Sequence, residues 1–299
     1  MRINQNIAAI NAWRNLGMTD RAMGKTMEKL SSGLRINRAA DDAAGLAISE
    51  RMRSQVNGLD RAVSNAQDGI SLIQTAEGAL DETHAALHRV RELTIQAANE
   101  VNEGGDVSKI QDEVSQLLTE IDRIAETTEF NTKNLLDFAV DGDGNLEGNE
   151  LTLQIGANEG QTMQITLQNM GSEHLAVFDG EPGDGDLAHL GAIDLTATVH
   201  EGEDTDITFE EVIEAIDTAI DEVSSFRSEL GSYQNRLEHT INNLEVASEN
   251  LTAAESRIRD ADMAAEMMSM TRHQIMTQAG TAMLAQANMR PQSVLQLLG

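Results

Sequence analysis

The stretch FEEVIEAIDTAIDEVSSFRSELGSYQNRLEHTINNLEVASENLTAAESRI, residues 209–258, places an apolar side chain at every seventh position without a gap. The residues in this row are Phe209, Ile216, Val223, Leu230, Leu237, Leu244, Leu251 and Ile258. A sustained seven-residue apolar repeat is typical of a helix whose seam packs along another helix. The stretch therefore predicts one long, coiled-coil-like helix.

An earlier segment, residues 52–93, supplies a second long apolar stripe. It begins with spacings of four and three, through Met52, Val56, Leu59, Val63, Ala66, Ile70 and Ile73. It then drifts toward Leu72, Ala76, Ala79, Ala86, Val90 and Leu93. The drift is expected because an α-helix has 3.6 residues per turn, so a seven-residue row slowly rotates around it. Two long helices with apolar seams predict a helical bundle.

The elements between these helices are shorter. Apolar residues on one face predict a third helix over residues 107–127, after a turn at the EGGD sequence of residues 103–106. Alternating apolar residues in LTLQIGANEGQTMQITL, residues 151–167, predict a β-hairpin around GANEG. Residues 171–206 are acidic and glycine-rich, which predicts exposed loops with a short strand at residues 193–199.

The two ends of the chain carry thin apolar stripes that are rich in methionine. Eleven of the fourteen methionines lie within residues 1–27 or 263–289. Methionine fills irregular apolar gaps and tolerates small shifts in packing, so these residues either fill a core or form a surface that repacks between related arrangements. Terminal segments of about 40 residues with thin apolar stripes bury too little surface alone. We therefore expect them to stay mobile until neighbouring subunits supply a packing partner.

Composition excludes several classes of function. The net charge is −29, and residues 100–222 carry 31 acidic and 3 basic side chains. We expect this acidic middle to face solvent, and nucleic acid is an unsuitable partner. Only four lysines occur, from which we hypothesise a saline or alkaline habitat. The chain has no cysteine, no run of 18 apolar residues to span a membrane, and no pattern of a cleaved signal peptide at its start.

Several segments, in order, resemble bacterial flagellins. They are LSSGLRINRAADDAAGLAISERM (30–52), SNAQDGISLIQTAEGALDETHAALHRVRELTIQAAN (64–99), IQDEVSQLLTEIDRIAETTEFNTKNLL (110–136), SRIRDADMAAEMM (256–268) and the closing QANMRPQSVLQLL. The resemblance implies a mainly α fold in which long antiparallel, coiled-coil-like helices from both termini pack as a rod. A β-hairpin and a small irregular central insertion complete that fold.

The resemblance also implies a division into domains. Residues 1–42 and 262–299 are expected to form an inner-tube helical domain, and residues 43–170 and 207–261 an outer-tube domain that includes the hairpin. Residues 171–206 are expected to form a short, acidic, exposed region. The similar segments at residues 30–52 and 256–268 would mark the junctions between the inner-tube and outer-tube helices.

The function implied is structural: a subunit that self-assembles into the extracellular flagellar filament for swimming, with neither catalysis nor cofactors. The family further implies passage through the type III export apparatus with an export chaperone, without a cleaved signal peptide. It implies addition beneath a filament cap and contact with hook-junction proteins. The alternatives are a flagellin-like hook–filament junction protein and, further from the pattern, a calcium-binding module.

One recognition site follows from the resemblance residue by residue. HRVRELTI, residues 88–95, is similar to the helix sensed by the flagellin-specific Toll-like receptor of animals. Arg89, Leu93 and, on the next helix, Glu113 match the central contact positions. The competing interpretation is that Leu93 belongs to the helix seam and Arg89 pairs with a neighbouring acid.

Two patterns resemble metal sites without completing them. His84 and His88 have the spacing of a zinc-protease helix, but Ala85 stands where the general base would be, and no third ligand lies nearby in sequence. The DGDGNLEGNE segment, residues 141–150, offers Asp141, Asp143 and Asn145 as in a calcium loop. Leu146 and Thr152 occupy the positions that require Gly and Glu, and GEPGDGD, residues 180–186, is a poorer match still. We therefore predict no metal site.

Overall fold

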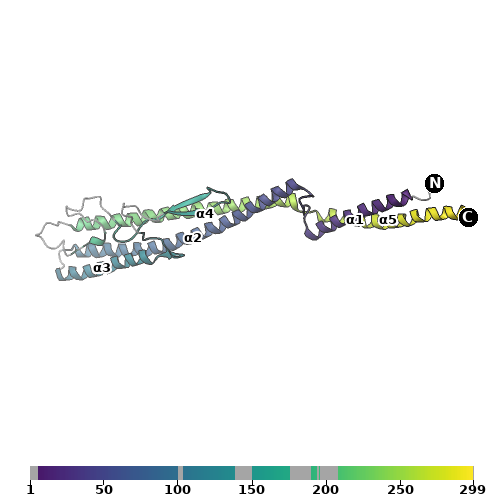
Figure 1. Ribbon diagram of the computed structural model, residues 1–299. Helices are drawn as coiled ribbons and strands as arrows, with labels where there is room; N and C mark the ends of the chain where they lie inside the picture. Colours follow the sequence, from purple (N-terminus) through teal and green to yellow (C-terminus); the bar gives the residue numbers. More distant parts are fainter. Residues whose placement is uncertain are drawn as a thin grey trace. The chain divides into compact units, whose positions relative to one another are not determined.

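The chain is mainly α-helical, as predicted, in a computed structural model that describes residues 6–99, 104–138, 150–175, 190–193, 195 and 208–298 (Figure 1). Side chains are described as far as residue 289. The elements are α1 (Ile7–Ser32), α2 (Ala43–Ala97), α3 (Gly104–Thr127), β1 (Glu129–Phe130), β2 (Lys133–Asn134), β3 (Glu150–Gln154), β4 (Thr162–Thr166), η1 (Leu190–Ala192), α4 (Phe209–Arg259) and α5 (Met263–Leu298).

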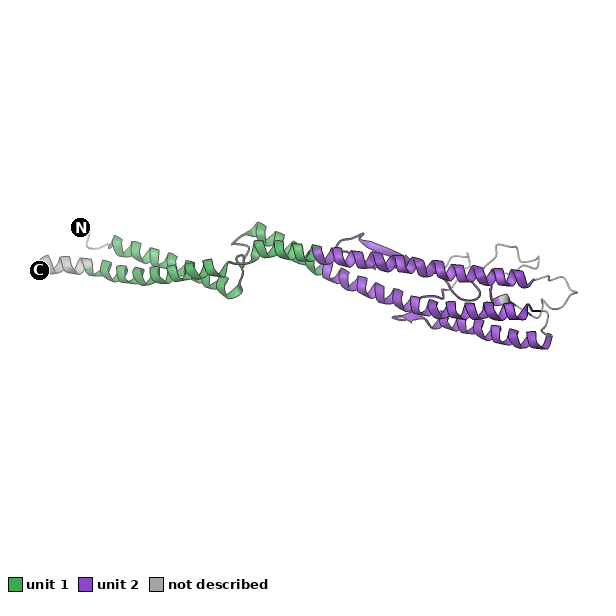
Figure 2. Cartoon of the chain, turned by 180° about the vertical axis from the view of Figure 1, so that it is seen from behind, with its two compact units in different colours: residues 1–57, 247–299 green, residues 58–246 purple. Residues whose placement is uncertain are grey.

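The chain divides into two compact units (Figure 2). Unit 1 contains residues 1–57 and 247–299, and unit 2 contains residues 58–246. The division falls within α2 and α4, so each of these helices contributes to both units. Unit 1 is therefore built from one segment at each end of the sequence, and unit 2 from the continuous segment between them.

The core of unit 2 lies along the predicted seams of α2 and α4. Ile216, Val223, Leu230 and Leu237 of the seven-residue row are fully buried. The predicted drift of the α2 stripe is also confirmed, because Leu72, Ala76, Val90 and Leu93 are buried. Ion pairs flank the seam at two levels: Arg91 Nε lies 2.6 Å from Asp217 Oδ1, and Arg227 Nη1 lies 3.1 Å from Asp81 Oδ1. Since residue 91 meets 217 and residue 81 meets 227, the two helices run antiparallel.

Helix α3 adds a third apolar face to this core. It begins at Gly104, three residues before the predicted start, so the two glycines of EGGD lie in its first turn and not in a loop. Its buried residues are Val107, Ile110, Val114, Leu118, Ile121 and Ala125. Their spacing of three and four confirms the predicted amphipathic helix.

The predicted β-hairpin is present, and a smaller one was missed. Strands β3 and β4 pair antiparallel, with Leu151 opposite Ile165. Met163, Ile165 and Leu167 are buried while the residues between them are more exposed, which gives the strand alternation. Strands β1 and β2 form a second, tight hairpin whose two turn residues, Asn131 and Thr132, both have positive φ. A β-branched threonine rarely adopts that conformation, so the sequence carries little signal for this turn.

The expectation that residues 171–206 are exposed is wrong for the part that the structure describes. Leu175, Leu190, Ile193 and Leu195 are buried in the unit 2 core. The amide of Gln111 on α3 holds this segment, donating from Nε2 to the Ile193 carbonyl at 2.9 Å and accepting from the Leu195 N–H at 2.9 Å. Most of the predicted strand at residues 193–199 lies outside the described residues. The described insertion is therefore anchored to the helical core.

Glycines on α2 make room for the β3–β4 hairpin. A Cβ atom on Gly58 would lie 2.9 Å from Ala157 Cβ and 3.2 Å from its Cα, in the hairpin turn. A Cβ on Gly69 would lie 2.5 Å from Leu153 Cδ1. Gly78, on the same helix, has no heavy atom within 4 Å of that position. Close approach of the hairpin backbone thus requires a bare helix surface at residue 58.

Gly58→Ala should lower the stability of the protein although alanine is the better helix former. Overpacking costs about 1–3 kcal/mol, whereas the helical gain is about 1 kcal/mol, so we expect a net loss of order 1 kcal/mol. Gly78→Ala is the matched control and should gain about 1 kcal/mol. Thermal unfolding followed by circular dichroism measures both. Equal changes in the unfolding midpoint of the two variants would show that the hairpin leaves room for a Cβ atom at residue 58.

Candidate functional site

Unit 1 contains a pair of antiparallel terminal helices, α1 and α5, that lie side by side (Figure 1). At one end the Asn6 amide donates to the Ala287 carbonyl at 2.8 Å. At the other end Lys29 Nζ lies 3.2 Å from Glu266 Oε1. The two helices are therefore in contact over most of the length of α1.

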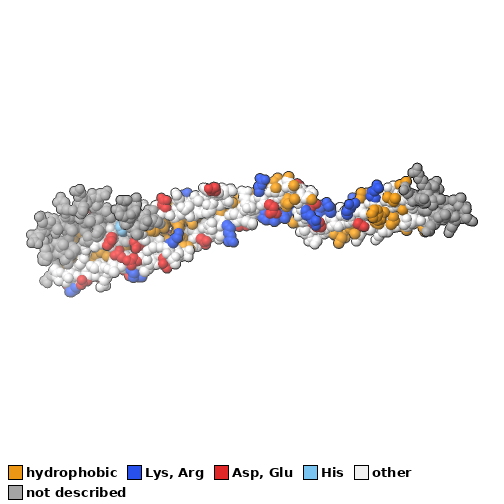
Figure 3. Space-filling view, viewed as in Figure 1, with side chains coloured by type: hydrophobic (Ala, Val, Ile, Leu, Met, Phe, Trp, Pro, Cys, Tyr) orange, Lys and Arg blue, Asp and Glu red, His pale blue; other side chains and the backbone are white. Residues whose placement is uncertain are grey.

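This helix pair buries very little of its apolar surface. In α1 and the described side chains of α5, only Thr19, Thr26 and Ala287 are buried. Large apolar side chains remain exposed instead, and Trp13 at 69%, Met268 at 66% and Met283 at 64% are the most exposed. The others on these helices are Ile7, Ile10, Met18, Met27, Met263, Met267, Ile275, Met276 and Met289. We call these twelve residues the terminal apolar surface; Figure 3 shows hydrophobic side chains gathered over this part of the chain.

One stretch of the terminal apolar surface forms an open groove on α5. It is lined by Met267, Met268, Thr271, Arg272, Ile275 and Met276. Soluble monomers rarely expose contiguous apolar surface of this kind, and such patches mark sites of association. Burying one exposed Met or Ile completely stabilises a complex by about 1.5–3 kcal/mol. The terminal helices are therefore built to be covered by another surface.

The two helix breaks in unit 1 pair with each other. Helix α1 ends at Gly33, which has φ 73° and donates its N–H to the Lys29 carbonyl, a left-handed cap that glycine adopts without strain. The next residues meet the break between α4 and α5: the Arg35 N–H donates to the Arg259 carbonyl at 2.6 Å, and the Ala261 N–H donates to the Gly33 carbonyl at 2.9 Å. The breaks are thus joined by backbone hydrogen bonds, and we call them together the junction.

An aspartate stands just before each helix that begins at the junction, α2 and α5. The Asp42 side chain accepts from the Gly45 N–H at 2.9 Å before α2, and the Asp262 side chain accepts from the Ala264 N–H at 2.9 Å before α5. Both are N-caps, which satisfy amides that the first helical turn leaves free. The Asp41 carboxylate accepts a hydrogen bond from the Arg38 backbone N–H in the segment between α1 and α2. This hydrogen bond lowers the pKa of the Asp41 carboxyl. Stop and start signals therefore lie within residues 33–42 and 260–262.

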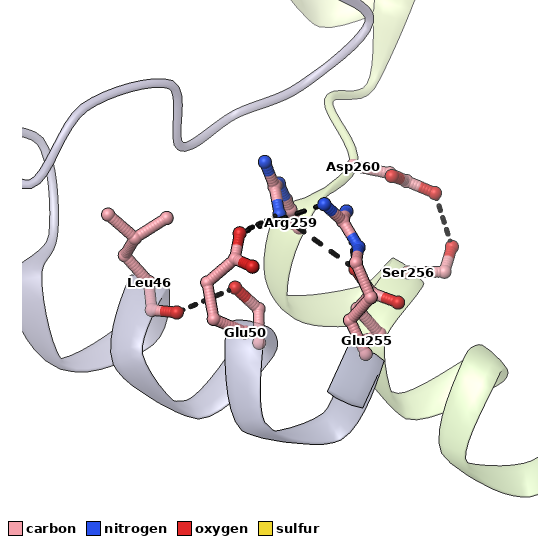
Figure 4. A network of polar contacts seen from close by, with 8 residues as sticks. Leu46, Glu50, Glu255, Ser256, Arg259 and Asp260 are labelled. Carbon is pink, nitrogen blue, oxygen red and sulfur yellow. Dashed lines mark hydrogen bonds and ion pairs between the residues drawn. The ribbon is translucent and has the colours of Figure 1, made fainter. Parts of the chain in front are cut away.

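Four charged residues beside the junction connect α2 to α4, and Figure 4 labels three of them, Glu50, Glu255 and Arg259. Arg259 Nη1 lies 2.7 Å from Glu50 Oε1, and Arg53 Nη2 lies 2.8 Å from Glu255 Oε1. The alternative pairs within each helix are longer, at 3.7 Å for Arg53 and Glu50 and 4.0 Å for Arg259 and Glu255. The Arg259 side chain is only 13% exposed. The shorter pairs cross between the helices, so this cluster holds them together next to the break.

Arg259→Ala should loosen the junction without unfolding unit 2. A hydrogen bond to a charged group contributes about 1.5–3 kcal/mol, which corresponds to tenfold or more in local opening. We expect the amides of Arg35 and Ala261, which bond across the junction, to exchange hydrogen at least about tenfold faster. Arg257→Ala, an exposed arginine two residues away, is the control and should leave both amides unchanged. Unaltered exchange in Arg259→Ala would mean that the backbone pairing holds without the arginine.

The structure brings two of the three predicted recognition residues together. Arg89 on α2 donates to Glu113 on α3 from Nη2 at 2.9 Å and from Nε at 3.2 Å. The hydrogen bonds that Arg89 donates to Glu113 first, and then to Glu92, raise the pKa of its guanidinium. Leu93 is only 2% exposed and packs in the helix seam. The competing interpretation of Leu93 and Arg89, as a seam residue and an ion-paired arginine, therefore agrees with the structure.

Of the incomplete metal patterns in the sequence, only the histidine pair lies wholly within the described residues. The Nε2 atoms of His84 and His88 lie 3.0 Å apart on the surface of α2. Among the described residues, no group of three or more potential ligands is suited to a metal ion. Residues 141–149 and the GEPGDGD segment lie outside that part of the chain, so the prediction that they form no calcium site stays untested. No helix in the described ranges is both long and apolar enough to cross a membrane.

Long helices with uncovered apolar faces at both ends of the chain, and a separate well-packed core, define a structural protein that associates with other subunits. Comparison with known proteins gives the family. The model of the bacterial flagellin N-terminal helical region matches residues 3–140, and that of the C-terminal helical region matches residues 213–298. The chain belongs to the bacterial flagellin family, and it is a structural subunit of the flagellar filament that serves motility.

Individual relatives agree over the whole length. The chain is 54% identical to a flagellin of Bacillus subtilis and 53% identical to a flagellin of Halalkalibacterium halodurans, each over 100% of both chains. A solved structure of a putative flagellar hook-associated protein from Vibrio parahaemolyticus shares the fold, with a TM-score of 0.59 and 16% identity. It covers 74% of this chain and 100% of its own. The full-length identity favours a flagellin over the hook–filament junction alternative.

Proposed function

We propose that the terminal apolar surface is the main assembly surface of the subunit and that other copies of the chain cover it in the filament. On this basis residues 1–42 and 262–299 form the inner-tube domain, and residues 43–170 and 207–261 form the outer-tube domain. Residues 171–206 belong to the acidic region between the outer-tube segments. The proposal places assembly and the final packing of α1 and α5 in one event.

The contrast between the two units carries this proposal. Unit 2 has its own buried core, which includes Leu80, Leu87, Ile121 and Phe226. The terminal helices of unit 1 instead expose twelve large apolar side chains. In a protein that is stable as a monomer, a surface helix packs its apolar side chains against other parts of the same chain. The missing partner must therefore come from outside the chain, and a polymer of identical subunits supplies it at every level.

The same surface accounts for the export partners that the family implies. We infer that the subunit leaves the cell unfolded through the type III export apparatus, without a cleaved signal peptide. An export chaperone would cover α5 before export, and the filament cap and hook-junction proteins would receive the subunit outside. A thinly packed helix pair supports this route, because opening it exposes little additional apolar surface. The extracellular filament is the final location.

Ile275→Glu tests the assembly surface within the full-length chain. The side chain lies in the groove of α5 and is exposed, so the substitution should not change monomer stability. Burying a new carboxylate between subunits is costly, and we expect at least a tenfold loss of filament yield. Gln274→Glu, at the adjacent exposed position, introduces the same charge without removing an apolar side chain. Seeded polymerisation followed by light scattering and electron microscopy measures both variants.

Wild-type polymerisation of Ile275→Glu would contradict the assignment of α5 to an assembly surface. Loss of polymerisation in both variants to the same degree would assign the effect to charge alone. A far-ultraviolet circular dichroism melt of each monomer checks that the variants fold.

We also propose that the flagellin-sensing Toll-like receptor recognises the Arg89 and Glu113 pair on monomers. Both side chains are about half exposed and lie on neighbouring helices. Leu93 acts indirectly, by fixing the spacing of α2 and α3 from within the seam. The assignment to this receptor rests on the resemblance of residues 88–95 and on the accessibility of the ion pair.

Arg89→Ala should reduce receptor activation by purified monomer at least tenfold, because truncating an arginine at an interface hot spot costs about 2 kcal/mol or more. Arg123→Ala is the control, since Arg123 is an exposed arginine on α3 that pairs with Glu120 within its own helix. A reporter assay in receptor-expressing cells gives the half-maximal dose of each protein. Equal doses for Arg89→Ala and wild type, or an inactive wild type, would reject the proposal.

A further inference from the structure

Two histidines on α2 present a geometry that the filament role does not use. His84 and His88 lie one helical turn apart, and their rings meet edge to face with an interplanar angle of 86°. Their Nε2 atoms are 3.0 Å apart. An imidazole nitrogen binds a divalent metal ion at about 2.05 Å. An ion at that distance from both nitrogens would make an N–metal–N angle of about 94°, which suits two adjacent ligands.

We propose that His84 and His88 form a two-imidazole chelate for a divalent first-row transition metal, with Cu²⁺ the preferred ion. Two histidines four residues apart face the same side of a helix, which is why metalloprotease helices use this spacing. Imidazole is a ligand of Cu²⁺, Ni²⁺ and Zn²⁺, and affinities in this series peak at Cu²⁺. An angle near 90° also fits the square-planar preference of Cu²⁺, with water in the remaining positions.

The surroundings set the strength of the site. Asp81 lies one turn before His84 on α2, and its side chain is 69% exposed, so it can attract the cation. Arg227, which lies 3.1 Å from Asp81, opposes binding by its own charge. His84 Nδ1 is buried without a hydrogen-bond partner, and it must carry the proton when Nε2 binds a metal. With two protein ligands and this cost, the chelate should bind more weakly than a three-ligand site.

The competing explanation of the 3.0 Å distance is an N–H···N hydrogen bond between the two rings. In that arrangement one ring donates from Nε2 and the other accepts, and the pair needs no metal. The two explanations differ in an observable way. A chelated ion takes a lone pair from each Nε2, so two imidazole nitrogens must appear in its first coordination sphere.

Titration of full-length monomer with Cu²⁺ tests the chelate, with calorimetry for affinity and electron paramagnetic resonance for the number of bound nitrogens. We expect one principal site with two imidazole nitrogens in the wild type. His84→Ala and His88→Ala should each bind Cu²⁺ at least tenfold more weakly, with one imidazole from this site. His239→Ala is the matched control, because this exposed histidine on α4 has asparagines at positions 235 and 243, one turn away on either side.

Several results would overturn the proposal. Binding of Cu²⁺ through a single imidazole in the wild type would leave the hydrogen-bonded pair as the only explanation. Affinities within twofold of wild type in both histidine variants would place the ion elsewhere. Because His88 is exposed, His88→Ala keeps the test valid even if His84→Ala disturbs packing, and a circular dichroism melt identifies that case. Repeating the titration with Zn²⁺ should give weaker binding at the same pair, and stronger binding would contradict the stated preference.

Discussion

The terminal helices cannot bury their apolar side chains within one chain, and this shortage governs the rest of the structure. Apolar burial stabilises by about 25 cal/mol per Å² removed from water, so a helix pair that exposes Trp13, Met268 and Met283 leaves much of its stabilisation unrealised. Unit 2 has no such shortage, since its three helices and hairpin enclose Leu80, Ile121 and Phe226. One chain thus combines a part that is complete when alone with a part that is completed by neighbours. That combination is what a polymerising subunit requires.

Specific contacts at the junction separate the terminal helices α1 and α5 from the long helices α2 and α4. Gly33 ends α1, Asp42 and Asp262 restart the helices, and backbone hydrogen bonds join the two breaks. Arg259 then connects α4 to Glu50 of α2 beside the break, with little exposure to water. Charge follows a related pattern: residues 1–99 hold 11 acidic and 12 basic side chains, whereas residues 100–222 hold 31 and 3. We expect near-neutral ends to pack against copies of themselves more readily than the acidic middle, where like charges repel.

Periodic features could be predicted from the sequence, and long-range polar contacts could not. The row through Ile216, Val223, Leu230 and Leu237 is buried because helix geometry alone places these residues on one face. The alternation that predicts β3 and β4 is equally local. Gln111, by contrast, binds backbone groups more than 80 residues away, and no local pattern announces that contact, which is why the insertion was expected to be exposed. The Arg259–Glu50 pair was missed for the same reason. The role of Leu93 needed the structure as well, because a seam residue and a contact residue look alike in sequence.

Fluorescence of Trp13 tests most directly whether neighbouring subunits cover the terminal apolar surface. Trp13 is the only tryptophan of the chain and is 69% exposed, so its emission reports this surface without a label. During seeded polymerisation of the wild-type protein, the account predicts a blue shift of the emission maximum and a several-fold fall in quenching by acrylamide, in proportion to the mass of filament formed. Filaments that form while Trp13 keeps its monomer emission and full access to the quencher would contradict it.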